Sequence, residues 1–190
     1  LHLSIRRQRQ MCIRDSYINL QGDEPLVRPT DIEALAAGML ADASVNVGTL
    51  CHPINAHEAG NPNTVKVVLA SNGNALYFSR SPIPYPRDSE VAAYLKHVGV
   101  YAYRREVLAA YADLPQPMME HAEKLEQLRL MAAGYCIRAY IVEPTGPGVD
   151  TPECLEQVRT LMSGHTPAPT PTLADIRLVI TDVDLSLIHI

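Results

Sequence analysis

Short apolar runs alternate with segments of helical period along most of this chain. Runs with the β-branched and aromatic content of strands cover residues 17–20, 45–50, 65–69, 75–79, 97–103 and 137–142. Segments 29–39, 106–111, 119–133 and 151–162 carry apolar residues three or four positions apart, which predicts helices. Strands that alternate with helices favour an α/β fold, and a hairpin signal at Asn72-Gly73 makes the predicted sheet mixed, mostly parallel, with flanking helices.

The predicted helix over residues 119–133 carries an apolar stripe beside a row of glutamates. The stripe has helical spacing and consists of Ala122, Leu125, Leu128 and Met131. Glutamates at three-residue spacing predict a solvated face, here Glu120, Glu123 and Glu126. Glu126 and Gln127 lie beside the stripe, so one of them is expected to point inward at the rim of a cleft.

The two ends of the chain differ from its middle. Residues 1–16 are rich in arginine without a hydrophobic period, and with residues 185–190 they resemble translated sequencing-adaptor read-through, so both are predicted to be extraneous. Residues 163–175 form a Pro/Thr linker, and residues 176–184 are predicted to be the first strand of a second domain that the chain does not complete. The main domain is therefore expected at residues 17–162, incomplete at its N-terminus.

Composition excludes several classes of protein. The net charge of −5 gives no general attraction to nucleic acid or anionic membranes, and the absence of Trp with a single Phe argues against a base-stacking platform. The four cysteines show no framework spacing, which favours reduced thiols and a cytoplasmic protein. No apolar run approaches the roughly 20 residues that a membrane-spanning helix needs.

Two acidic phrases, QGDEP at residues 21–25 and GVDTPE at residues 148–153, carry the candidate chemistry. Asp23 follows a strand and a glycine, and Asp150 precedes a helix. If the fold brings them together, two such carboxylates can hold a hard divalent cation such as Mg²⁺. The residues alone leave two alternatives open, because Asp23 also suits a turn and Asp150 also suits a helix N-cap.

Basic and polar residues near strand ends are candidates for binding an acidic ligand. They are Lys66, Arg80, Lys96 and His97, and each is also readable as a solvated surface charge. His97 and Tyr101 share one face of a strand whose other face is apolar, a pattern that a half-exposed sheet also produces.

Six phrases in order along residues 17–162 resemble the 3-deoxy-manno-octulosonate cytidylyltransferase (CMP-Kdo synthetase) family. They are QGDEP (21–25), NPNTVKVV (61–68), ALYFSRSPIPYPRD (75–88), KHVGVYAYRR (96–105), EKLEQLRLMAAG (123–134) and GVDTPECLEQVR (148–159). The resemblance implies a nucleotide-diphospho-sugar transferase (Rossmann-like) fold. It also implies a reaction of CTP with 3-deoxy-D-manno-octulosonate (Kdo) that gives CMP-Kdo and pyrophosphate for lipopolysaccharide biosynthesis.

The same resemblance assigns roles to particular residues. Asp23 and Asp150 would be catalytic ligands of Mg²⁺ at the phosphates, and Arg80 would pair with the Kdo carboxylate. The sugar-acid pocket would consist of Gln21, Arg80, His97, Tyr101, Glu126 and Gln127. The family is commonly dimeric, so a homodimer is expected, with the Pro-rich loop after residue 80 and the neighbouring hairpin as a candidate interface.

The chain departs from the family pattern at one point. No loop of the R-x-x-S-x-R-L-P-G-K type, which binds the triphosphate in the family, precedes QGDEP. The 190-residue chain is therefore expected not to form CMP-Kdo by itself, and formation of that product would overturn the expectation. Two other functions remain open: a cytidylyltransferase for another acidic sugar such as an acylneuraminate, and a non-catalytic sugar-binding module.

The phrase IRLVITDVD at residues 176–184 resembles the opening strand of haloacid-dehalogenase-like phosphatases, in particular the Kdo 8-phosphate phosphatase. By that resemblance Asp182 would be the nucleophile and Asp184 the general acid/base. The parent protein is then expected to be a fusion of two Kdo enzymes, and this chain is expected to have no phosphatase activity.

Overall fold

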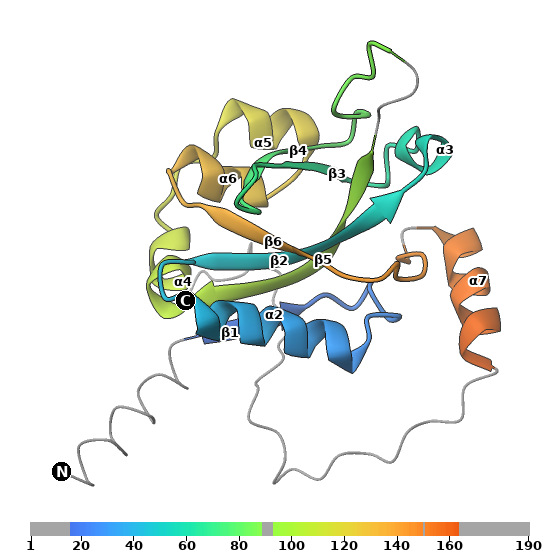
Figure 1. Ribbon diagram of the computed structural model, residues 1–190, viewed down its shortest axis with the longest axis horizontal. Helices are drawn as coiled ribbons and strands as arrows, with labels where there is room; N and C mark the ends of the chain where they lie inside the picture. Colours follow the sequence, from blue (N-terminus) through green and yellow to red (C-terminus); the bar gives the residue numbers. More distant parts are fainter. Residues whose placement is uncertain (1–15, 89–92, 150, 164–190) are drawn as a thin grey trace, which may run out of the picture.

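The structure, a computed structural model, describes residues 16–88, 93–149 and 151–163, which form a six-stranded mixed sheet with helices on both faces (Figure 1). The strands are β1 (Ser16–Leu20), β2 (Val47–Ile54), β3 (Lys66–Leu69), β4 (Ala75–Ser79), β5 (Tyr94–Arg104) and β6 (Ile137–Ile141). The helices are α2 (Pro29–Ala41), α3 (Ala56–Ala59), α4 (Arg105–Tyr111), α5 (Met118–Glu123), α6 (Gln127–Ala132) and α7 (Pro152–Ser163). The predicted α/β class and mixed sheet are confirmed. The prediction that the sheet is mostly parallel is wrong, because four of the five strand pairings in the described residues are antiparallel and only β2 and β6 pair in parallel.

The strand order is β4-β3-β5-β2-β6, and β1 also pairs with β5. β2 and β6 are parallel neighbours, whereas β5 is antiparallel to β1, β2 and β3. β1, β2, β3 and β6 therefore run in one direction, and β4 and β5 run in the other. The Asn72-Gly73 turn joins β3 and β4 as predicted, and Gly73 takes the φ of 83° that such a turn favours in glycine.

β5 is the longest strand and organises the sheet. Along one edge it pairs with β2 over nearly its whole length. Along the other edge β1 pairs with Val100–Arg104 and β3 pairs at Lys96. β1 ends and β3 begins on either side of a short stretch of the β5 edge that contains Gly99. This stretch has no neighbouring strand among the described residues, and the candidate site lies over it.

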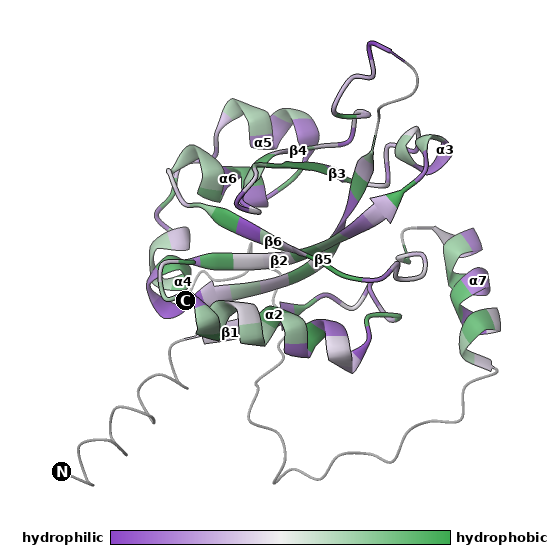
Figure 2. Cartoon of the chain, in the orientation of Figure 1, coloured by the Kyte–Doolittle hydropathy of each residue, from purple (hydrophilic) through white to green (hydrophobic). Residues whose placement is uncertain are grey.

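Each face of the sheet buries an apolar cluster (Figure 2). On one face Leu35 and Met39 of α2 pack with Val98 and Val100 of β5. The opposite cluster joins Tyr101 and Tyr103 of β5 to side chains of α4 and α6, among them Val107, Tyr111, Leu128 and Leu130. Residues on both faces of β5 are buried, so the half-exposed sheet considered for this strand is wrong.

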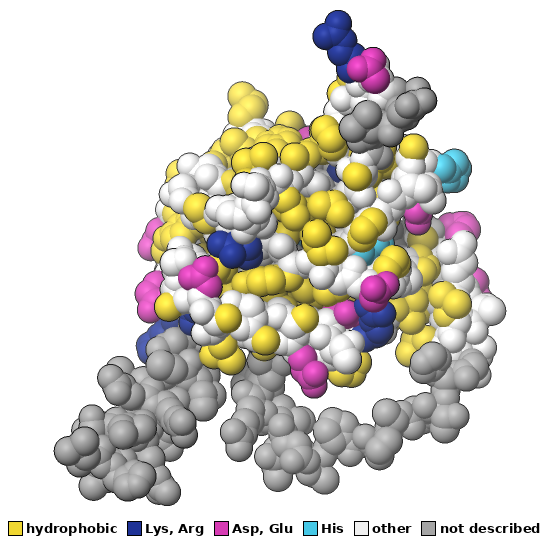
Figure 3. Space-filling view, viewed as in Figure 1, with side chains coloured by type: hydrophobic (Ala, Val, Ile, Leu, Met, Phe, Trp, Pro, Cys, Tyr) yellow, Lys and Arg dark blue, Asp and Glu magenta, His cyan; other side chains and the backbone are white. Residues whose placement is uncertain are grey.

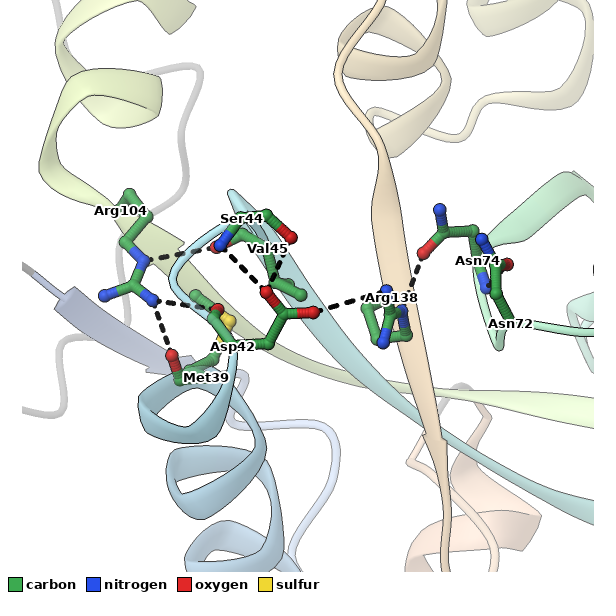
Figure 4. A network of polar contacts seen from close by, with 8 residues as sticks. All are labelled: Met39, Asp42, Ser44, Val45, Asn72, Asn74, Arg104 and Arg138. Atoms are coloured by element: carbon green, nitrogen blue, oxygen red, sulfur yellow. Dashed lines mark hydrogen bonds and ion pairs between the residues drawn. The ribbon is translucent and has the colours of Figure 1, made fainter.

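Arg104, the last residue of β5, ties the C-terminal end of α2 to the sheet (Figure 4). Its Nε donates to the Val45 carbonyl at 3.1 Å, one terminal nitrogen donates to the carbonyls of Met39 (2.5 Å) and Asp42 (3.3 Å), and the other donates to Ser16 Oγ at 3.3 Å. Met39 lies in the last turn of α2 and Asp42 is its C-cap residue, so their carbonyls have no intrahelical donor. The guanidinium therefore serves as a C-terminal cap supplied by a distant strand.

The helix predicted over residues 119–133 is wrong as a single element, because it divides into α5 and α6. Lys124 lies between them with φ 54°, a left-handed conformation that ends α5. Ala122 of the predicted apolar stripe is exposed. The solvated row of glutamates is also wrong in part: Glu120 is buried and Glu123 is half-buried, whereas Glu126 is exposed.

Basic and acidic side chains are scattered singly over the described face that Figure 3 shows, without a patch of one sign. None of the helices in the described ranges has both the length and the apolar character needed to cross a membrane.

Candidate functional site

A cavity of about 800 Å³ opens beside the uncovered stretch of the β5 edge. Its walls come from the turn after β1, the loop before β3, the end of β4, β5 itself, the α5–α6 turn and the segment before α7. It brings together all the predicted site residues that the structure describes: Gln21, Asp23, Arg80, His97, Tyr101, Glu126 and Gln127. Asp150, Asp182 and Asp184 lie outside the described residues.

The two acidic phrases lie side by side at one wall of this cavity. The backbone N–H of Val149 donates to the carbonyl of Asp23 at 2.8 Å, which joins the turn after β1 to the residue that precedes Asp150. Glu24 secures the same turn, because its Oε1 accepts from the N–H of Gly99 at 3.2 Å. Gly99 makes this approach possible: a Cβ at that position would lie 2.6 Å from Gln21 Oε1.

This wall suits a hard cation. Asp23 is exposed and lines the cavity, and carboxylate oxygens are what Mg²⁺ prefers when phosphate oxygens and waters complete its coordination. Within the described ranges no group of three or more His, Cys, Asp or Glu side chains forms a closed metal cage. An open site with one or two carboxylates is the arrangement that these donors fit.

Arg80 supplies positive charge at the opposite wall. Its Nε donates to the Glu123 carbonyl at 2.7 Å, and one terminal nitrogen donates to the Pro62 carbonyl at 3.0 Å. Both acceptors are neutral, and among the described residues no carboxylate forms a salt bridge with this guanidinium. The full charge and several N–H donors of Arg80 are therefore available to an anion in the cavity.

The Glu123 carboxylate holds the backbone beneath Arg80. It accepts from Ser79 Oγ at 2.6 Å and from the backbone N–H of Arg80 at 2.8 Å. One residue thus fixes Arg80 twice, through its carboxylate and through its carbonyl. The sequence suggested a solvated glutamate here because the partners lie more than forty positions away.

His97 is buried at the base of the cavity in its neutral form. Burial, and to a smaller extent the charge of Lys96, lower the pKa of its imidazole to about 3. Its Nε2 lies 3.0 Å from Thr49 Oγ1, whose hydroxyl has the Val100 carbonyl as an acceptor at 2.8 Å. If Thr49 donates to that carbonyl, Nε2 carries the proton and Nδ1 is left as an acceptor.

An aromatic row extends from His97 along one face of β5. The ring centroids of Phe78 and His97 are 5.1 Å apart, those of His97 and Tyr101 are 5.2 Å apart, and Tyr101 stacks on Tyr103 at 5.6 Å. Burial raises the pKa of both tyrosines, so both hydroxyls are neutral near pH 7. This rigid row forms the floor of the cavity.

The α5–α6 turn forms the remaining wall. Glu120 and Arg129 make a buried bidentate pair across this turn, with Nε–Oε2 at 2.8 Å, and the guanidinium lies 4.8 Å over the ring of Tyr111. The Glu120–Arg129 salt bridge joins α5 to α6. At the start of α6, Gln127 is buried and Glu126 is exposed, and both line the cavity. Gln127 is therefore the one of these two residues that points inward, as predicted for one of them.

Before α7, Thr151 Oγ1 accepts from the backbone N–H of Cys154 at 3.3 Å, so Thr151 serves as the N-cap of this helix.

Asn19 is a cavity residue that the sequence analysis missed. It faces Tyr101 across the β1–β5 pair, and its buried Oδ1 has no hydrogen-bond partner among the described residues. Its polar side chain within an otherwise apolar strand is a signal that could have identified it. Lys66 was predicted as a candidate cation with a solvated alternative, but it is fully buried and bonded to backbone carbonyls, and nothing local in the sequence signals that burial.

The fold is similar to that of nucleotidyltransferases of known structure. The family model described as cytidylyltransferase matches residues 8–139, so the chain belongs to the cytidylyltransferase family. Among curated relatives, the 3-deoxy-manno-octulosonate cytidylyltransferase of Escherichia coli is 64% identical over 149 residues, which are 78% of this chain and 61% of that protein. The protein of the same name from Chlorobium limicola is 47% identical over 152 residues, 78% of this chain and 62% of its own length.

A solved structure gives the same answer. The structure of CMP:2-keto-3-deoxy-manno-octonic acid synthetase complexed with CTP matches with a TM-score of 0.76 and 64% identity, over 78% of this chain and 62% of that chain. The resemblance found in the sequence is thus confirmed. The chain spans about three fifths of the length of these relatives.

Proposed function

We propose that this chain carries the sugar-acid side of a CMP-Kdo synthetase, which joins CTP and Kdo to give CMP-Kdo and pyrophosphate. In the proposed reaction the anomeric hydroxyl of Kdo attacks the α-phosphate of CTP, and pyrophosphate leaves. The names of the relatives support the choice of substrates, since they are Kdo cytidylyltransferases and one of their structures was solved with CTP. The same reasoning favours Kdo over an acylneuraminate.

The observation that carries the proposal is the guanidinium of Arg80 in the cavity, which forms no salt bridge with any carboxylate of the described residues. A sugar acid brings one carboxylate and many hydroxyls. Arg80 offers a bidentate fork for the carboxylate, while Gln21, Gln127 and the neutral His97 offer amide and ring groups for the hydroxyls. The buried rings of His97, Tyr101 and Tyr103 beside the cavity would lower the local dielectric and so strengthen these contacts.

Mg²⁺ is the proposed cofactor, held by Asp23 together with Asp150. The Val149–Asp23 backbone bond supports the pairing, because it keeps the two acidic phrases adjacent. When bound, the ion would supply positive charge to neutralise the phosphates of CTP. Asp23 lines the same cavity as Arg80, so a nucleotide held through the ion and a sugar acid held at Arg80 would share that cavity.

Titration calorimetry of the chain with Kdo tests the proposal. Kdo is expected to bind, and its methyl ester, which lacks the carboxylate charge, is expected to bind at least tenfold more weakly, a difference of about 1.4 kcal/mol. N-acetylneuraminate serves as the matched competitor acid. Equal affinity for Kdo and its ester contradicts the role of Arg80, and tighter binding of N-acetylneuraminate favours the acylneuraminate alternative.

Three further parts of the proposal concern the parent protein. A homodimer is proposed from the family resemblance and is checked by light scattering. A cytoplasmic location accords with the free thiols of Cys51, Cys136 and Cys154. The fused phosphatase-like strand with Asp182 and Asp184 is a proposal from sequence alone, which the reading frame downstream of residue 184 tests.

A further inference from the structure

Lys66 heads the fully buried side chains of the described residues when these are ranked by size, with 0% of its surface exposed. Its Nζ donates to three backbone carbonyls: Asn61 at 3.0 Å, Thr64 at 2.5 Å and Arg80 at 2.5 Å. An ammonium group has three hydrogens, so each of them has an acceptor. The side chain is therefore a three-point cross-link between the loop before β3 and the end of β4.

Packing does not explain a lysine at this position. Removing an ammonium from water is costly, and apolar side chains of similar volume usually replace buried charges without loss of stability. No carboxylate lies within salt-bridge distance of Nζ among the described residues. Desolvation lowers the pKa of Lys66, the charge of Arg80 lowers it further, and Glu123 raises it. The three carbonyls are what offset the desolvation.

The backbone that Lys66 holds is the backbone that orients Arg80. The Pro62 carbonyl, between the two loop residues bound by Lys66, accepts from the Arg80 guanidinium. Lys66 also binds the carbonyl of Arg80 itself, while Glu123 holds the N–H of that residue. Asn61, Thr64 and Arg80 all line the cavity. Loss of the cross-link would release the loop and the arginine together.

We propose that Lys66 is a positioning residue of the sugar-acid subsite, whose buried ammonium fixes the 61–64 loop so that the Arg80 guanidinium is pre-oriented toward the ligand carboxylate. Pre-orientation raises affinity by removing the cost of ordering a long side chain on binding. The identity of the ligand rests on the proposed function, whereas the cross-link and its action on Arg80 do not.

A set of four variants tests the proposal by calorimetry with Kdo. Lys66→Met removes the ammonium at similar volume, Arg80→Met removes the guanidinium, and the double variant combines them. Arg105→Met is the control, since it removes one exposed positive charge from the start of α4, where no cavity residue is disturbed. Lys66→Met is expected to weaken Kdo binding about tenfold, and Arg105→Met less than twofold. In the Arg80→Met background, Lys66→Met is expected to have no further effect.

A spectroscopic signal separates positioning from mere stabilisation. In the wild type the Nε–H resonance of Arg80 should be sharp and exchange slowly, because that group donates to the Glu123 carbonyl. In Lys66→Met it should shift and broaden as the guanidinium becomes mobile. If Lys66→Met folds, keeps this resonance and binds Kdo as the wild type does, the proposal is wrong.

A measurement on the wild type covers the case in which Lys66→Met does not fold. Acylation by a water-soluble amine reagent should modify Lys124 rapidly and Lys66 at least a hundredfold more slowly, with Kdo slowing Lys66 further. Equal rates for the two lysines, or no effect of Kdo in a protein that binds it, would contradict the proposal. If the wild type binds no Kdo, the proposed function is contradicted instead. The Lys66 proposal is then tested by the Nε–H resonance of Arg80, which should be sharp and slow to exchange if Arg80 is held in place.

Discussion

Arg80 and Arg104 both donate to backbone carbonyls, but they differ in how many donors they use. Arg104 commits both terminal nitrogens and Nε to four acceptors, of which Figure 4 shows the carbonyls of Met39, Asp42 and Val45 near the end of α2. The fourth acceptor is Ser16 Oγ at the start of β1. Arg80 makes two hydrogen bonds within the described part of the chain and faces a cavity. Arg104 uses its donors to bind the backbone near the end of α2. Arg80 is held in place by two hydrogen bonds, and its remaining N–H donors and its charge stay available to a ligand.

The difference shows how one residue type serves two purposes. A guanidinium whose donors are satisfied by carbonyls at a helix end repairs a local defect of the backbone. A guanidinium anchored through a minority of its five donors keeps its geometry yet stays able to bind a ligand. Of the two residues that anchor it, Lys66 is fully buried, whereas Glu123 is half-buried, as is Arg80 itself.

The largest expected effect is that of Arg104→Met on stability. It leaves three backbone carbonyls around residues 39–45 without this donor, and the free energy of unfolding is expected to fall by about 3 kcal/mol. Urea denaturation measures the change. Kdo affinity per folded molecule should stay within twofold, and a loss of affinity comparable to that of Arg80→Met would break the comparison.

Arg80→Met is expected to show the converse. Kdo affinity should fall about a hundredfold, because a carboxylate would then be desolvated without its cation, while the free energy of unfolding changes by less than about 1 kcal/mol. Calorimetry and urea denaturation on the same preparation check both halves. If Arg80→Met lowers the free energy of unfolding but leaves Kdo affinity unchanged, Arg80 is a structural residue and the comparison with Arg104 is wrong.

The cavity side also predicts a pH dependence of stability through His97. His97 has a pKa of about 3 in the folded protein and 6.5 as its ordinary value, so below about pH 6 the unfolded chain binds a proton that the folded chain excludes. Stability is therefore lost as the pH falls from 6 toward 3, by about 1.4 kcal/mol per pH unit from this residue. The slope of unfolding free energy against pH measures it. His97→Gln should flatten that slope, and an unchanged slope would mean that His97 is not buried neutral.

Gly99→Ala is expected to have the smallest effect. The added methyl would meet Gln21 Oε1 at 2.6 Å, and a flexible side chain can move aside at little cost in stability. Kdo affinity should fall about fivefold as Gln21 is displaced, with thermal stability nearly unchanged. Gly134→Ala, at an open position with φ 88°, is the matched control: it should lower stability through backbone strain and leave affinity unchanged.

Much of the fold could be predicted from the sequence, because its strands and helices follow local patterns. β4 was predicted at its observed bounds, and β1 and β6 to within one residue. The break at Lys124 could not be predicted, since a lysine in the left-handed region carries no turn signature. The Glu120–Arg129 pair holds that break, and such a pair is visible only in three dimensions.

The site divides in the same way. Asp23, Arg80, His97, Tyr101 and Gln127 were found through motifs, and the fold brings them to one cavity. Their supporting residues, Thr49, Lys66 and Glu123, were missed or misread because their partners come from other strands and loops. Motifs identify the side chains that face the ligand, whereas the residues behind them depend on tertiary contacts.

The gap along the edge of β5 sets the size of the binding site through strand length. β1 stops at Leu20 and β3 begins at Lys66, so the N–H of Gly99 bonds to the Glu24 side chain and not to a neighbouring strand. An insertion that extended β1 by two residues would continue the ladder across this stretch and fill the cavity with backbone. The cavity thus occupies the place where a longer β1 would have paired with β5. The turn at Gly22 ends β1 early enough to leave that place open.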